Sequence, residues 1–274
     1  MSAPSAGLDR RQLMALARVW LRKDMHLAGG RGAGMAGVFI LSSLFMLLGV
    51  LGAGAMVFAG VPRFAYTTLA LLFGSMPTAM AIITDFGVAA VDISDQDVVG
   101  HRPVSDRTYL SARLLTVGFY AMAVGLPAQL PYALAGLIAP GSSDGYPLAY
   151  LLVATLVIAA TTSAVVVVYA SIARLFGPRR LANLVLFIQL FSIGLFFVGG
   201  PMIAPTTALL ARLDLEQPGA LLALPWAWAA ACVELLLGHF DVTTLLLAAA
   251  FAGLVGALCW VLPGKLSLGY VDAL

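Results

Sequence analysis

The feature that most constrains this chain is a set of six long stretches that contain no Asp, Glu, Lys or Arg. Each stretch exceeds the ~20 residues that a helix needs to cross the hydrocarbon core of a bilayer. In lipid, every backbone N–H and C=O must be satisfied internally, and the stretches lack the alternation of barrel strands. The sequence therefore predicts an all-α polytopic membrane protein with six transmembrane helices. The stretches cover residues 36–62, 64–84, 114–143, 145–173, 181–211 and 242–264.

Basic residues are divided unevenly between the segments that flank these stretches. Of the 15 Lys and Arg residues, all but Arg63 and Arg212 lie on one side of the predicted membrane. Cytoplasmic loops of membrane proteins carry such an excess of positive charge. The first apolar stretch also starts too late, and is too long, for a secretory signal peptide. We therefore predict a multi-pass protein of the cytoplasmic (inner or plasma) membrane with both termini in the cytoplasm.

Composition agrees with one membrane domain. The chain is 61% hydrophobic and only 10% charged, which excludes an ordinary soluble domain. We expect a single transmembrane domain over residues 1–274. It comprises a cytoplasmic segment (1–34), a six-span bundle (35–264) and a cytoplasmic tail (265–274).

The first cytoplasmic segment predicts an amphipathic helix over residues 8–25. Leu13 and Leu16 fall on one face at helical spacing, whereas Arg11 and Arg18 fall on the opposite face. Such a helix lies in the membrane interface with its cations toward anionic headgroups. The same pattern also suits docking onto a cytoplasmic partner, and both interpretations stay open.

A second short helix is predicted before the last span. The segment from Pro225 to Gly238 starts with proline and ends with glycine, which is good helix punctuation. Its 14 residues would reach about 21 Å, too short to span. Trp226 and Trp228 favour an interfacial position, and Glu234 lies in the same segment. We predict a re-entrant or interfacial helix on the external side. The alternative is that this segment merely extends the sixth span.

Several kinds of chemistry are missing from the sequence. There is no phosphate-binding glycine loop and no zinc-protease or nucleophile-elbow motif. His26, His101 and His239 are too scattered to suggest a metal site, and Cys232 and Cys259 are expected to be packed free thiols. We expect no catalytic residues, metal, cofactor or nucleic-acid partner, and the chain is not expected to be an enzyme.

The most polar segment lies between the second and third spans and reads DISDQDVVGHRPVSDRTYLSAR from Asp92 to Arg113. A capping-box-like start and the proline at 103 predict a helix of barely two turns. Val98 and Val99 would be its apolar anchors, surrounded by charges, which is the anatomy of a small protein interface. The alternative is a solvated loop whose arginines only set topology.

This segment resembles the first cytoplasmic loop of type-2 ABC exporter permeases. The residues that match that family's pattern are Asp95, Val98, Val99, Pro103, Val104, Ser105, Arg107, Ala112 and Arg113. Val99 departs from the leucine that is more usual there. The Leu-Pro-Trp-x-Trp run at 224–228, followed by Gly238, is similar to the family's motif before the last span.

The resemblance implies that the loop forms a coupling helix inserted into a cleft of an ATPase subunit. The implied coupling residues are Asp95, Asp97, Val98, Val99, Arg102 and Pro103. The chain would be the membrane permease subunit of an ATP-driven ABC exporter. Its partners would be an ABC ATPase subunit in trans, a second permease subunit in a homo- or heterodimer, and the lipid bilayer. The coupling helices would transmit the closure of the ATPases to the spans.

The resemblance leaves three points open. Many relatives continue with a second membrane half after a segment like 266–274, so a half-size subunit and part of a longer permease are both compatible with the sequence. The apolar walls admit lipids, peptides or drugs as substrate. A non-transport membrane scaffold that anchors cytoplasmic partners is the alternative function, and an intramembrane enzyme has little support.

Two features inside the spans complete the predictions. Asp85 lies about 10 Å into the membrane, where a lone carboxylate is costly. Asp85 and Arg113 are each 14 residues from Val99, so we predict that they form an ion pair across the second and third spans. An unpaired, inward-facing Asp85 is the alternative. In the third span, Pro127 and Pro131 predict a kink that serves either packing or a gated wall.

Overall fold

The computed structural model of the chain describes residues 11–16, 18, 19, 35–91, 106–141, 143–176 and 218–266. This part of the chain is helical throughout its regular structure and contains no strand, as the sequence predicts. The elements are α2 (Met35–Phe58), α3 (Arg63–Val91), α5 (Asp106–Ala135), α6 (Tyr146–Phe176), η2 (Pro218–Ala223), α9 (Pro225–Leu236) and α10 (Val242–Leu266).

Four of these helices are long and apolar enough to cross a membrane. Their apolar segments are Arg63–Ile83, Leu114–Ala135, Tyr146–Val168 and Val242–Val261. Helix α2 has 24 residues, and its stretch Ser42–Phe58 is apolar but shorter. The predicted fifth stretch, 181–211, lies outside the described residues. The structure therefore has the character of a multi-pass membrane protein, whereas the count of six spans stays a prediction.

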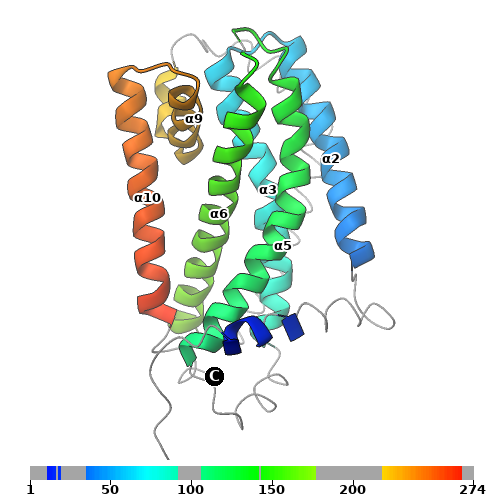
Figure 1. Ribbon diagram of the computed structural model, residues 1–274, viewed down its shortest axis with the longest axis vertical. Helices are drawn as coiled ribbons and strands as arrows, with labels where there is room; N and C mark the ends of the chain where they lie inside the picture. The colour runs from blue at the N-terminus through cyan, green and yellow to red at the C-terminus, as the bar shows by residue number, and fades with distance from the viewer. Residues whose placement is uncertain are drawn as a thin grey trace, which may run out of the picture.

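Helix α3 is the central helix of the described bundle (Figure 1). It packs against α5, α6 and α9, while α2 packs on the outer side of α5 and α10 packs on α6 and α9. The connections from α2 to α3 and from α5 to α6 lie at the same end as α9 (Figure 1). The opposite end carries the last residues of α3, the first residues of α5 and the helical residues 11–16, 18 and 19. The two ends of the bundle therefore carry different parts of the chain.

Small residues let α2 approach α5 closely. A Cβ atom added at Gly49 would lie 3.1 Å from the carbonyl oxygen of Ala128 and 3.2 Å from the ring of Pro131. Membrane helices use such residues because dispersion contacts, rather than hydrophobic expulsion from water, hold them together.

Pro127 lacks an N–H group, so the carbonyl of Ala123 loses its helical partner. The hydroxyl of Ser42 on α2 donates to this carbonyl at 3.3 Å. A neighbouring helix thus satisfies the group that the proline frees, as membrane interiors require. The proline pair is accommodated inside one helix of 30 residues.

The predicted break between α9 and α10 is confirmed. Helix α9 has 12 residues and begins with Pro225, and Leu237 forms its C-cap. Gly238 follows with φ +89°, a conformation that favours glycine, and α10 begins at Val242. At 1.5 Å per residue α9 is about 18 Å long, so it does not cross a bilayer. The segment is a separate helix and does not extend the last span.

The part of the N-terminal helix that the structure describes has the predicted two faces. Leu13 and Leu16 are half-buried, whereas Arg11 and Arg18 are exposed. The predicted helix over 8–25 is described only at residues 11–16, 18 and 19. Within those residues the predicted apolar face is less exposed than the face that carries the arginines.

Candidate functional site

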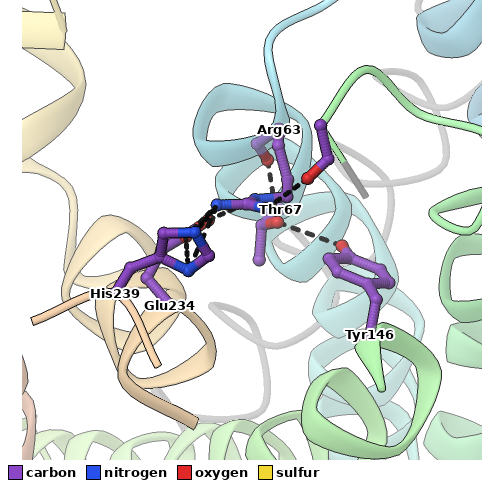
Figure 2. Close-up of polar contacts among 6 residues, drawn as sticks. Arg63, Thr67, Tyr146, Glu234 and His239 are labelled. Carbon is purple, nitrogen blue, oxygen red and sulfur yellow. Dashed lines mark hydrogen bonds and ion pairs between the residues drawn. The ribbon is translucent and has the colours of Figure 1, made fainter. Parts of the chain in front are cut away.

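The strongest polar contact of the described bundle joins the first residue of α3 to the last turn of α9. Arg63 Nε donates to Glu234 Oε1 at 2.9 Å, and Arg63 Nη2 donates to Glu234 Oε2 at 2.5 Å. The two side chains are only 16% and 9% exposed. Two parallel hydrogen bonds between a guanidinium and a carboxylate give both strength and a fixed orientation. Figure 2 shows this pair and its neighbours.

Two further groups complete the cluster. Arg63 Nη1 donates to the carbonyl oxygen of Gly141, in the connection between α5 and α6. The ring of His239, just after α9, lies 3.4 Å from Arg63 Nη2 through Nε2 and 3.5 Å from Glu234 Oε2 through Nδ1. We call Arg63, Gly141, Glu234 and His239 the Arg63 clasp. It ties together three chain segments that are distant in sequence.

A layer of hydroxyl groups lies beneath the clasp. The hydroxyls of Thr67 and Tyr146 lie 3.0 Å apart, and Thr67 also donates to the carbonyl of Arg63 at 2.8 Å. Tyr66, the next buried aromatic, donates to the carbonyl of Tyr132 at 2.8 Å. These hydroxyls are paired inside the protein, and Thr67 connects the clasp to Tyr146 of α6 (Figure 2).

The two tryptophans of α9 fix this helix against the bundle. Trp226 Nε1 donates to Ser75 Oγ on α3 at 2.9 Å, and Trp228 Nε1 donates to the carbonyl of Leu222 at 2.9 Å. The alanines at 227, 229, 230 and 231 are fully buried. The indoles are half-buried and use their polar edge within the protein, which buried tryptophans ordinarily require. Their role here is to dock α9.

Deeper in the bundle, Gln129 of α5 is fully buried and accepts a hydrogen bond from the hydroxyl of Tyr150 of α6. The distance between Tyr150 Oη and Gln129 Oε1 is 2.5 Å. Thr78 of α3 is also fully buried. The α3–α5–α6 core therefore contains further buried polar side chains beyond the clasp.

The polar contacts of the Arg63 clasp hold α9 against the bundle. All three nitrogens of Arg63 are engaged, so its guanidinium is already neutralised and holds α9 in place. The described residues contain no group of three or more His, Cys, Asp or Glu that could hold a metal ion. Burial raises the pKa of the Cys232 thiol, which disfavours the thiolate needed for nucleophilic chemistry. Cys259 is exposed on α10, so the expectation of a packed thiol is wrong there.

The structure does not describe the residues that the sequence predicts for coupling to an ATPase. Asp95, Asp97, Val98, Val99, Arg102 and Pro103 lie outside the described residues. Asp85 and Arg113 lie within the helical backbones of α3 and α5, but their side chains are outside the described set. The coupling interface and the Asp85–Arg113 ion pair therefore stay predictions.

The external-helix residues are all described, and the structure brings one of them to a partner that sequence reasoning missed. Glu234 was expected only as part of the short helix, and Arg63 only as a topology marker. The sequence did contain a signal for the pairing of Glu234, because an acidic side chain buried in an apolar helix requires a cation nearby. Only Arg63 and Arg212 are predicted on that side of the membrane, so two candidates existed.

Comparison of the chain with protein families, with curated proteins and with solved structures found no match.

Proposed function

We propose that this chain is the membrane permease subunit of an ATP-driven ABC exporter. ATP hydrolysis would occur in a separate ATPase subunit, and two permease subunits would enclose the substrate path. The observation that carries the proposal is α9. The Pro-Trp-x-Trp run that resembles the family's motif opens a short separate helix, which docks on the bundle immediately before the last apolar helix.

The position of the predicted coupling segment supports the same function. Helix α3 ends at Val91 and α5 begins at Asp106, both at the end of the bundle opposite α9 (Figure 1). Residues 92–105 therefore connect two packed helices at the end that also carries the basic helix around Arg11. Two helices packed in this way would act as a lever, because a push on their connection would move both helices together.

The proposal is tested by purifying the chain together with candidate ABC ATPase subunits from the same organism. We expect one ATPase subunit to co-purify, and Val98→Asp to lower co-purification and substrate-stimulated ATP hydrolysis at least tenfold, because removing a central interface anchor commonly costs about 2 kcal/mol or more. Val242→Asp is the matched control, since this exposed valine starts α10 at the opposite end. Normal association and stimulation by the Val98→Asp protein would refute the coupling interface.

The orientation of the chain is tested separately by cysteine labelling in whole cells. With Cys232 and Cys259 replaced by alanine, Asp144→Cys should react with an impermeant maleimide from outside, since this residue is exposed between α5 and α6. Asp97→Cys should react only after permeabilisation, because the positive-inside distribution places it in the cytoplasm. Labelling of position 97 from outside would overturn the topology and, with it, the coupling role.

A further inference from the structure

Two fully buried polar side chains in the core each face a glycine on the opposite helix. A Cβ atom added at Gly74 of α3 would overlap the amide of Gln129 on α5. One turn further along, a Cβ atom added at Gly125 of α5 would overlap the hydroxyl of Thr78 on α3, and would lie 2.8 Å from Ile158 of α6. The two polar–glycine pairs thus alternate between the helices in one antiparallel register.

Neither polar side chain is satisfied. Gln129 Oε1 accepts from Tyr150, but Gln129 Nε2 has no hydrogen-bond partner among the described residues. Exchanging the two amide atoms would let Nε2 donate to Tyr150 and would leave Oε1 without a partner instead. The amide therefore presents one unused group in either orientation.

The hydroxyl of Thr78 is also unpaired within the part of the chain that the structure describes. This is unusual for a helical threonine here. Thr68 and Thr162, on α3 and α6, each donate to the carbonyl four residues earlier. Unpaired polar groups buried in a membrane protein are costly, because lipid offers them no hydrogen-bond partner. The two groups lie about one helical turn apart along the contact of α3 with α5, so a single small partner between them would bond both.

We propose that Gln129 and Thr78 bind one enclosed water molecule between α3, α5 and α6. The ligand is uncharged, because residues 64–83, 114–135 and 146–168 of these three helices contain no Asp, Glu, Lys, Arg or His that could neutralise an ion. It is small, because the side chains of Gln129 and Thr78 already occupy the space over Gly74 and Gly125. Water suits both groups, since it accepts from an amide and exchanges either way with a hydroxyl. This site is independent of the proposed transport function.

X-ray radiolytic labelling tests the site directly, because pulsed X-rays produce hydroxyl radicals from water in place. We expect the ring of Tyr150, which bonds Gln129, to be oxidised several-fold faster than that of Tyr66 in the protein purified in lipid nanodiscs. Tyr66 is the matched control, since it is equally buried but donates to the carbonyl of Tyr132. Thr78→Val should reduce Tyr150 oxidation to the control level. Equal protection of both rings in the unmodified protein would overturn the proposal, and would be the result if Gln129 and Thr78 bonded each other directly.

Thermal unfolding of the same samples gives a second test. The Tm of the Thr78→Val protein should change in opposite directions if Thr78 binds water and if its hydroxyl has no partner. If water is bound, Thr78→Val removes one of its ligands, and we expect Tm to fall by about 2–6 °C. If the hydroxyl has no partner, the isosteric valine removes an unsatisfied group and Tm should rise, which would overturn the proposal. Thr68→Val is the control and should change Tm by no more than about 2 °C, since its bond is local to α3.

Discussion

The Arg63 clasp makes a sharp prediction about what holds α9 on the bundle. Removing either charged partner leaves the other charge largely out of water, with Arg63 16% and Glu234 9% exposed. Helix α9 has few other polar ties to the long helices, the bond from Trp226 to Ser75 being the described one. We therefore predict that Glu234→Ala and Arg63→Met each destabilise the protein, and that the loss concerns the docking of α9.

The magnitude follows from the geometry. Breaking a fully buried ion pair by removing one member commonly costs about 3–5 kcal/mol. The residual exposure of Arg63 reduces this to about 3 kcal/mol, which corresponds to a fall in Tm of roughly 6–12 °C. Glu234→Gln keeps the shape and one acceptor oxygen, so we expect a smaller loss of about 1 kcal/mol. Replacing both residues by methionine removes both charges and should recover more than half of the loss.

The assay is thermal unfolding in detergent, followed by the fluorescence of the tryptophans in α9. An early transition in this signal is expected for Glu234→Ala, because Trp226 and Trp228 report on the docking of that helix. Two results would refute the reasoning. One is a Tm within about 2 °C of the unmodified protein for both single variants. The other is a double-methionine variant whose loss equals the sum of the two single losses, because partners in an ion pair are not additive.

Two further predictions concern packing and the spans. A Cβ atom at Gly136 would overlap the ring of Tyr146, so Gly136→Ala should lower Tm by several degrees in an unfolding assay. Gly118 has open space around it, so Gly118→Ala is the control and should leave Tm unchanged or slightly raised. Equal changes in Tm for the two variants would contradict this prediction. If Asp85 and Arg113 are paired, exchanging the two residues should preserve membrane assembly, measured by size-exclusion chromatography, better than either single alanine variant. An exchange that is worse than both single changes would count against the pair.

The helical elements were predictable because their signals are local. Charge-free length predicted apolar helices where the structure has them, and Pro225 and Gly238 marked a separate helix to within two residues of its observed end. The clasp was not predictable in the same way. Arg63 and Glu234 are 171 residues apart, and no local pattern connects them. Only the requirement that a buried acid find a cation linked them, and that requirement left Arg212 as an equal candidate.

The register of α3 against α5 shows the same limit more quantitatively. A turn centred on Val99 pairs residues whose numbers add to 198, which places Asp85 opposite Arg113. The observed contacts pair Gly74 with Gln129 and Thr78 with Gly125, whose numbers add to 203. Continued along straight helices, that register would offset the backbones of Asp85 and Arg113 by five residues, about 7.5 Å. Only a long side chain bridges such a distance, so the exchange experiment also tests how straight the hairpin is. The alignment of α3 with α5 is set at positions where a glycine on one helix leaves room for a large side chain of the other. The hydrophobic periodicity of the sequence does not show which glycine faces which side chain.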